Sequence, residues 1–424
     1  MDLILIVVLL VVFFALVMLL KWPVSLSLAI TSIVLAVVAG QFNKDLLEHL
    51  TNGMFGYLDV SLVLITAMIF MKVIEKNGLL AALTKKLIVT FGKSPLALLI
   101  VITILIMFPG AITGSCSASV LSTGVLLAPV LMQLNMPRHV AGAIITMASV
   151  YGMIAPPVNI IVMIIGAGID VPYIGFNGIL MMVILPLAIL STLYMGYGYA
   201  RKADLNAVVE KFKQQETKSG FLLYLPLIVM LVLMIVPKIF PQQIPDPSLP
   251  LTFTIAILLA LLGGGHKFSL PQVAREGVDE ILPIVCLLIC VGMLLEVMTL
   301  IGLRGYIVVS MLSLPAALIM LGMAVSLPAF GGISVFGSAS VLGVPFALAL
   351  LGSNQIVVIT ALSLIAAMGS FTPPVALTPV VTAQVIGEPD YKKLIWPCAV
   401  PIAVAIIVGL LMIHFAEPIA KLVL

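Results

Sequence analysis

The pentapeptide Ser-Ala-Ser-Val-Leu occurs twice in this chain, at Ser117–Leu121 and again at Ser338–Leu342. Each copy is followed by Pro-Pro-Val, first at Pro156–Val158 and then at Pro373–Val375. The pentapeptides lie 221 residues apart and the proline pairs 217, about half the length of a chain of 424 residues. Because both elements recur in the same order and at nearly the same offset, the sequence indicates a duplicated fold.

Composition places both copies in a membrane. Hydrophobic residues make up 62% of the chain, charged residues only 9%, and the mean hydropathy is +1.32. A soluble domain carries roughly 25% charged residues, so this chain cannot present a water-facing surface on every side. Its apolar runs lack the alternation of a transmembrane barrel, and the expected class is therefore an all-α polytopic membrane protein. The four cysteines lie in apolar segments, so neither a disulfide framework nor a metal site is expected.

The apolar runs long enough to cross about 30 Å of hydrocarbon lie near 3–20, 22–40, 58–74, 177–199, 221–240, 250–265, 281–300 and 394–415. Two further helices, near 140–168 and 355–386, are interrupted by the proline pairs. Two segments, 95–134 and 307–351, have apolar arms on both sides of a middle rich in glycine and serine. Each of these could be two full crossings or one re-entrant hairpin.

Positive charge decides between these alternatives, because cytoplasmic loops of membrane proteins carry an excess of Lys and Arg. If both segments are hairpins, every Lys and Arg lies inside except Lys44, Lys238, Arg304 and Lys421. If 95–108 were a full crossing, the lysines of 76–93 and Arg138 would lie on opposite sides. We therefore expect two re-entrant hairpins and ten crossings, five in each half.

An odd number of crossings gives the second half the opposite orientation in the membrane. The sequence thus predicts two inverted repeats, 1–205 and 221–424, joined by a cytoplasmic linker at 206–220. Both termini are expected outside. The first hairpin would open toward the cytoplasm and the second toward the outside, and the amphipathic stretch Leu79–Gly92 suits an arm along the membrane surface.

The hairpin tips and the proline breaks are where backbone groups lose their helical partners. At membrane depth such backbone is tolerated only where protein or a water-filled cavity satisfies it. Carbonyls and Ser/Thr hydroxyls are hard oxygen ligands that suit Na⁺, and the N-termini of half-helices offer partial positive charge to an anion. Glycine and serine also pack helices closely, but packing alone predicts neither the duplication nor the matched offsets.

Other classes of protein are disfavoured by what the sequence lacks. It has no Walker loop, no His-Glu-x-x-His helix and no Gly-x-Ser-x-Gly elbow, so an enzyme is not expected. The longest hydrophilic loop has about twenty residues, too few for an ATPase domain. Carboxylates within the spans are scarce, which disfavours a proton relay. Transport driven by an ion gradient, or passive transport, remains, and no nucleic acid partner is expected.

Over essentially its whole length the chain resembles the large membrane (M) subunit of the tripartite ATP-independent periplasmic (TRAP) transporters, DctM-like members of the ion-transporter superfamily. The motifs that carry the resemblance are Trp22-Pro23-Val24, the tip Gly114–Ala118, the break Ile154–Pro157, the tip Gly337–Ser340 and the break Thr372–Pro374.

The resemblance implies an elevator-type transporter of the bacterial inner membrane that couples Na⁺ to the uptake of small organic acids, C4-dicarboxylates or related carboxylates. It also implies two partners, a small four-helix membrane subunit and a periplasmic solute-binding protein. No cofactor is implied beyond Na⁺ as the coupling ion.

Carried over residue by residue, the resemblance implies Na⁺ ligands in both halves of the chain: Gly114, Ser115, Ser117, Ala155 and Pro156, and then Gly337, Ser338, Gly369, Thr372 and Pro373. The substrate would lie between the tips, at Ser119, Asn159, Ser340 and Thr378.

The chain departs from the family pattern at Cys116, at Val158-Asn159 and in having no arginine in the expected substrate zone. Two alternatives remain open at this point. One is a stand-alone ion-coupled organic-anion carrier that needs no binding protein, and the other is a channel or a non-transporting membrane scaffold subunit.

Overall fold

The computed structural model describes residues 2–214, 217, 220–240, 242–262 and 269–423. Lys218, Lys267, part of the expected linker 206–220 and the end of the expected span 250–265 lie outside these ranges. Within them every regular element is a helix and none is a strand, and eight helical segments are long and apolar enough to cross a membrane. The expectation of an all-α polytopic membrane protein is confirmed.

The helices of the first half are α1 (Asp2–Phe14, continued by a π-helical turn at Ala15–Leu19), α2 (Val24–Val38), α3 (Asp45–Phe55), α4 (Leu58–Asn77), α5 (Leu79–Phe91), α6 (Pro95–Thr113), α7 (Cys116–Ser119), a π-helical turn (Val120–Gly124), α8 (Val125–Gln133), α9 (Arg138–Ile154), α10 (Ile160–Gly168), α11 (Phe176–Ala200) and α12 (Leu205–Gln214).

The helices of the second half are α13 (Phe221–Ile239), α14 (Leu249–Leu262), α15 (Leu270–Leu300), α16 (Leu303–Leu312), α17 (Ala316–Gly331), α18 (Val335–Ser338), a π-helical turn (Ala339–Gly343), α19 (Val344–Ala349), α20 (Gln355–Ala367), a 3₁₀ turn (Met368–Phe371), α21 (Leu377–Ile386), α22 (Lys392–His414) and α23 (Ala416–Val423).

Three helix boundaries differ from the sequence expectation. Helix α15 begins at Leu270 rather than near 281. Its first turns carry charged residues, and because these lower the local hydropathy, the apolar run detected in the sequence starts later than the helix. Helix α3 was not expected from the sequence. Its Asp45 and Glu48 lower the hydropathy of this segment in the same way. The second hairpin does not begin at 307: the separate helix α16 runs to Leu312, and a new helix starts after Pro315. A proline disfavours helical backbone in the residue before it, which separates the two helices.

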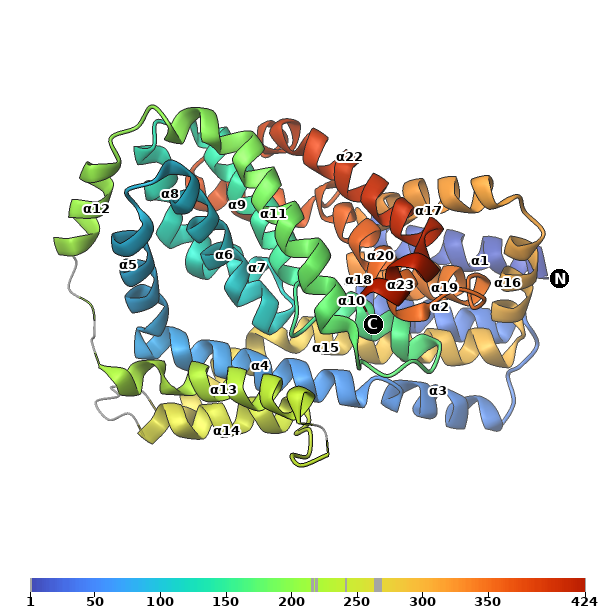
Figure 1. Ribbon diagram of the computed structural model, residues 1–424. Coiled ribbons are helices and arrows are strands. Elements are labelled where there is room, and N and C mark those ends of the chain that lie inside the picture. Colours follow the sequence, from blue (N-terminus) through green and yellow to red (C-terminus); the bar gives the residue numbers. More distant parts are fainter. Residues whose placement is uncertain (1, 215–216, 218–219, 241, 263–268, 424) are drawn as a thin grey trace.

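The long helices form one group of the molecule. Helix α15 packs along α2, α3 and α4, and α14 packs against α4. In Figure 1, α3, α4 and α15 run along one side with α13 and α14 beside them. The amphipathic helices α5 and α12 lie at one end of the molecule, and α16 and the N-terminus lie at the other. We call α2, α3, α4 and α15 the long-helix group.

The two broken helices occupy the most buried part of the fold. Helix α9 packs against α6, α11 and α22, and α20 packs against α22. Every residue of α9 from Val140 to Ile154 is buried, as is every residue of α20 from Val357 to Ala367. By contrast only 17% of the most apolar window of α13 is buried, as expected for a helix that faces lipid. The first break is therefore enclosed by protein, where its unpaired backbone can find partners, whereas Pro373, Pro374 and Val375 of the second break are exposed.

Candidate functional site

Each hairpin turns through a serine that caps the helix after it. The hydroxyl oxygen of Ser115 accepts a hydrogen bond from the backbone N–H of Ala118 (3.3 Å), and that of Ser334 accepts one from Gly337 (3.0 Å). A serine in this position satisfies an amide that has no partner within the helix. In both halves four residues of α-helix and five of π-helix follow, ending at Gly124 and Gly343. These two serines start equivalent tip helices.

The spacing of these structural elements differs from the spacing of the repeated pentapeptides. The capping serines, the π-helical turns and the closing glycines all recur 219 residues apart, two fewer than the pentapeptides. Ser117 is therefore the structural counterpart of Phe336, and Ser119 that of Ser338. The repeated Ser-Ala-Ser-Val-Leu strings are thus offset by two residues from the structural elements that recur around them.

Each proline break is tied to the hairpin arm of its own half. The backbone N–H of Val158 donates to the carbonyl oxygen of Ala111 (N···O 3.0 Å), and that of Val375 donates to Gly332 (N···O 3.2 Å). The Pro156–Pro157 and Pro373–Pro374 peptide bonds are both cis. The two halves thus connect arm and break through the same backbone contact.

In the second half the arm and the break also approach closely where each has a glycine, Gly331 in the arm and Gly369 in the break. A Cβ placed on Gly331 would lie 2.9 Å from the Cα of Gly369, and one placed on Gly369 would lie 2.6 Å from the Cα of Gly331. Real Cβ atoms do not approach backbone this closely. Gly369 therefore lets the second arm and the second break meet backbone to backbone.

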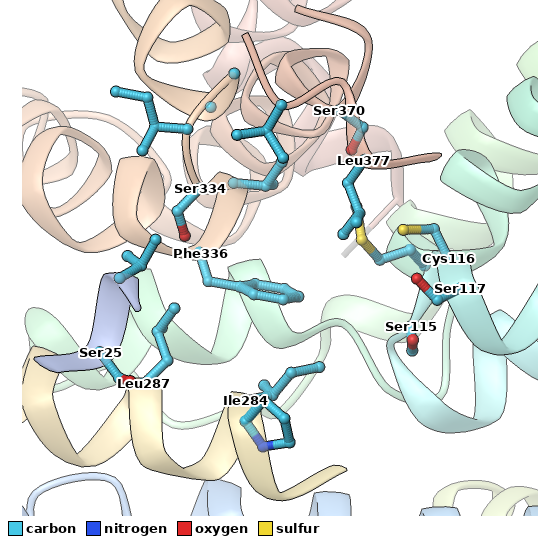
Figure 2. Close-up of a pocket in the computed structure, with 18 of the residues that line it drawn as sticks. Ser25, Ser115, Cys116, Ser117, Ile284, Leu287, Ser334, Phe336, Ser370 and Leu377 are labelled. Atoms are coloured by element: carbon cyan, nitrogen blue, oxygen red, sulfur yellow. The ribbon is translucent and has the colours of Figure 1, made fainter. Parts of the chain in front are cut away.

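A cavity of about 280 Å³ lies where both tips, the second break and the long-helix group meet. Its lining includes Ser115, Cys116 and Ser117 of the first tip and residues 331–336 of the second. Ser370, Val375 and Leu377 come from the second break, and residues 23–25 and Pro283, Ile284 and Leu287 come from α2, the turn before it, and α15. In Figure 2 the ring of Phe336 points into the middle of this group. Five serines line the cavity, and none of its lining residues is charged.

Of the expected Na⁺ ligands, only Ser115 and Ser117 line this cavity. Ser338 is fully buried and donates its hydroxyl to the carbonyl oxygen of Leu327 (2.8 Å). A Cβ on Gly114 would clash with the side chain of Ile160, just past the first break. The carbonyls of Thr372 and Pro373 lie against Gly332.

Three other expected ligands lie in the same two regions. Ala155 directly follows α9 and precedes Pro156, and Gly337 donates its amide to the capping serine of the second tip. The structure thus brings each tip to its own break, but it keeps most of these residues outside the cavity.

The expected substrate residues do not line the cavity. The amide oxygen of Asn159 accepts from Val162 N–H, and its amide nitrogen donates to the Ile154 carbonyl and the Ser363 hydroxyl, so all its polar atoms are used. Thr378 donates to the sulfur of Cys116 (3.1 Å), which joins the second break to the first tip. Asn159 and Thr378 therefore have structural contacts outside the cavity: Asn159 connects the first break to α20, and Thr378 connects α21 to the first tip.

The two remaining expected substrate residues, both serines, are fully buried. Ser340 donates to the carbonyl oxygen of Gly337 (3.0 Å). The hydroxyl of Ser119 has no hydrogen-bond partner in the described part of the chain. It lies beside Gly110, since a Cβ there would be 2.5 Å from the Ser119 oxygen. Ser119 is thus an unsatisfied oxygen beside the first arm.

Sequence reasoning missed the residues that α2, α15 and the second tip contribute to the cavity. Pro23, Ser25, Ile284 and Leu287 belong to or adjoin ordinary apolar spans, and no local pattern shows that they face the tips. Ser334 could have been found, because a serine three residues before Gly337 has the spacing of a helix cap. The search for repeated strings drew attention to Ser338 instead.

Two side chains connect the long-helix group and α16 to the end of α10. The hydroxyl of Tyr57, between α3 and α4, donates to the carbonyl oxygen of Ile164 (3.0 Å). Arg304, in the first turn of α16, donates to the carbonyl oxygen of Gly168, and also to the hydroxyl of Thr299 (2.9 Å). Both therefore bind the carboxyl-terminal half of α10, and we call them the α10 latch.

Comparison with known proteins agrees with the architecture. The family model of the tripartite ATP-independent periplasmic transporter, DctM component, matches residues 10–419. The crystal structure of the transporter YdaH from Alcanivorax borkumensis, described as having an unusual topology, superposes with a TM-score of 0.61. That match covers 88% of this chain and 89% of YdaH at 15% sequence identity, so it supports the fold alone. No curated protein matches the chain.

The family match confirms what the motifs at the tips and breaks predict. It extends over nearly the entire chain, including both hairpins, both breaks and the long-helix group. The chain belongs to the DctM-component family of the tripartite ATP-independent periplasmic transporters.

Proposed function

We propose that this chain is the large permease subunit of a Na⁺-coupled importer of small organic acids in the bacterial inner membrane. The observation that carries the proposal is the cavity built jointly by the two tips, the second break and the long-helix group. A pocket between the repeats is where such transporters bind their substrates. Its serine hydroxyls are donors suited to a carboxylate.

Two inverted repeats and an elevator motion are part of this proposal. Figure 1 supports them, since the arms of α6 and α17 approach the middle of the molecule from opposite ends. The equivalent caps, π-helical turns and arm–break contacts support descent from a single duplicated unit. The group formed by α6, α9, α11, α20 and α22 would carry the cavity past the long-helix group.

We assign Na⁺ to the backbone and hydroxyl oxygens at each tip and break. The shifted register makes Ser119 and Ser338 equivalent, and both are fully buried behind the tips. Ser119 has an unsatisfied oxygen, and Ser338 keeps its oxygen lone pairs free because its hydroxyl acts as a donor. Hydroxyl and carbonyl oxygens are ligands of hard cations. Ser117, which lines the cavity, is then available to the substrate.

In a tripartite system this component works beside a small membrane subunit and a periplasmic binding protein. We propose a four-helix membrane subunit and a solute-binding protein as the partners of this chain. The apolar surfaces of α1 and α13, each only 17% buried over their most apolar windows, leave room for a membrane partner as well as for lipid.

The test is uptake into proteoliposomes that contain the chain with its two partners. An inward Na⁺ gradient should drive accumulation of a labelled organic acid, and replacing Na⁺ by K⁺ should abolish it. Ser119→Ala and Ser338→Ala should raise the Na⁺ concentration needed for half-maximal uptake, whereas Ser310→Ala, at an exposed position on α16, should not.

The other outcomes identify the alternatives. Uptake by the chain without partners would favour a stand-alone carrier. Flux that runs only down the gradient of the acid, whichever cation is present, would favour a channel. Accumulation that follows a proton gradient and ignores Na⁺ would refute the proposed coupling.

A further inference from the structure

The helix that follows each proline break packs against the tip helix of the opposite half. Helix α21, after the second break, contacts α7 of the first tip, and α10, after the first break, contacts α18 of the second tip. Each tip is therefore supported by the other half of the chain as well as by its own. The position of a tip at the cavity depends on both supports.

One of these two cross-contacts contains a hydrogen bond. The hydroxyl of Thr378 in α21 donates to the sulfur of Cys116 in α7, with an O···S distance of 3.1 Å. Thr378 is fully buried and Cys116 is 6% exposed, so water competes little for this bond. The breaks recur after 217 residues and the tip helices after 219, which makes Ile161 and Val335 the equivalent pair in the other cross-contact. Their side chains are apolar, so the cross-contact has a side-chain hydrogen bond in one half only.

The turn before Thr378 has an unusual backbone conformation. Ala376 has φ 41° and ψ 51°, in the left-handed region that favours glycine, and its side chain is buried. Asn159, at the equivalent position of the first break, has φ −115°. A positive φ in a residue with a side chain costs free energy and persists where the surrounding contacts hold it. The second break therefore bends differently from the first, directly before the residue that contacts the first tip.

Cys116 also belongs to the lining of the cavity, between Ser115 and Ser117. The hydroxyl of Ser117 is hydrogen-bonded to the same sulfur. Because a thiol sulfur is a weak acceptor, a carboxylate oxygen of a substrate can replace it as the partner of this hydroxyl. Thr378 is not in the lining, so its bond to Cys116 can remain while a substrate is bound.

We infer that Cys116 and Thr378 are positioning residues: their hydrogen bond holds the first tip against α21 and so keeps Ser115 and Ser117 at the wall of the cavity. Their effect on substrate binding rests on the proposed function, whereas their effect on the position of the tip does not. Loss of the bond should let the first tip move away from the second break. Cys116 should then become more accessible, and substrate binding should weaken.

The first test measures the position of the tip without any substrate. The purified full-length chain in detergent is treated with N-ethylmaleimide, and mass spectrometry follows the alkylation of each cysteine separately. Thr378→Val keeps the shape of the side chain and removes its hydroxyl, whereas Thr378→Ser keeps the hydroxyl. Cys116 should react about 2- to 10-fold faster in Thr378→Val, the factor that corresponds to one neutral hydrogen bond. In Thr378→Ser its rate should not change.

Two controls separate movement of the tip from general loosening of the fold. Cys398 is fully buried and its sulfur contacts the Ala143 carbonyl of α9, so it should react at the same rate in every variant. Thr146→Val removes a buried hydroxyl that donates to Gly142 within its own helix, and it should leave Cys116 unchanged.

The direction of the change is informative in itself. The thiolate is the reactive form of a cysteine, and a hydrogen-bond donor stabilises it, so loss of the Thr378 hydroxyl without movement of the tip would slow the reaction. A slower or unchanged rate at Cys116 in Thr378→Val would overturn the inference. Equal acceleration in Thr146→Val, or at Cys398, would also overturn it.

The second test measures substrate binding in the proteoliposomes described above. Thr378→Val should raise the concentration of acid that gives half-maximal uptake about 2- to 10-fold and leave the maximal rate unchanged. Cys116→Ala should have the same effect, and the two substitutions together should do no more than either alone, because both remove the same bond. Thr378→Ser should behave as the unchanged chain.

Additive effects of Thr378→Val and Cys116→Ala, or a fall in the maximal rate alone, would overturn the inference. Failure of the inference is distinguishable from failure of the proposed function. If the unchanged chain accumulates no acid, the proposed function fails, and the alkylation of Cys116 still tests whether Thr378 positions the first tip.

Discussion

The hydrogen bonds of the α10 latch should set the ratio of the populations of two positions of α10. Helix α10 packs against α20, so in the proposed elevator motion it would move with α20 past Tyr57, which breaks the hydrogen bond from the tyrosine hydroxyl to Ile164 (3.0 Å). A neutral hydrogen bond contributes about 0.5–1.5 kcal/mol net. Tyr57→Phe should therefore shift the ratio of the two positions about 2- to 10-fold away from the one described here.

Arg304→Gln should have the larger effect. Hydrogen bonds to charged groups contribute about 1.5–3 kcal/mol, and this guanidinium binds both the Gly168 carbonyl and the Thr299 hydroxyl. The expected shift exceeds tenfold. Tyr194→Phe is the matched control for Tyr57→Phe, since Tyr194 is 64% exposed on α11 and its hydroxyl makes no hydrogen bond within the described residues.

The assay measures the distance between spin labels on α15 and α11. Cysteines at Leu282 and Leu190, both exposed, carry the labels in a chain whose native cysteines are replaced. We expect two distance populations. Their ratio should change most in Arg304→Gln, less in Tyr57→Phe and not at all in Tyr194→Phe. Identical distributions in all three variants would refute the reasoning, because the latch would then be maintained or irrelevant in every position.

Three further perturbations test the topology, the first break and the long-helix group. Cysteines at Lys93 and Arg138 should react with an impermeant reagent from the same side of the membrane; labelling from opposite sides would eliminate the first re-entrant hairpin. Asn159→Ala should lower the free energy of unfolding by about 2–3 kcal/mol, since it removes a helix cap and leaves buried polar groups unpaired; an unchanged unfolding midpoint would contradict this. Gly292→Ala should destabilise by about 1–3 kcal/mol, because its Cβ would lie 2.0 Å from a backbone oxygen of α3, whereas Gly305→Ala, with open space around it, should not.

The sequence predicted the class of fold and the location of the tips and breaks. Hydropathy was sufficient for the spans because lipid-facing helices such as α13 are apolar on every side. It failed at α3, whose Asp45 and Glu48 are exposed to solvent, and at the start of α15, where charged residues pair with neighbours within the protein. Lys72 of α4 binds Glu280 of α15 (2.6 Å), and Lys76 binds Glu276 (3.0 Å). Such pairs lower hydropathy without ending a helix.

The site was predicted less completely because its geometry depends on register and on tertiary contacts. The pentapeptide match pairs Ser117 with Ser338, but the first arm extends further before its tip, which shifts the equivalence by two residues. Asn159 was expected at the substrate site from the resemblance, and only the structure shows that its amide caps α10. The contribution of α15 to the cavity is a contact between segments far apart in the chain, which a single sequence does not reveal.

The central claim is that the cavity between the two tips is the substrate site. An experimental structure of the complete transporter with Na⁺ and a bound acid tests it most directly. The account predicts density for the acid in contact with Ser117 and Phe336. Density instead in the small cavity beside Lys72 and Glu280, or in the one beside Lys238 and Asp246, would contradict it.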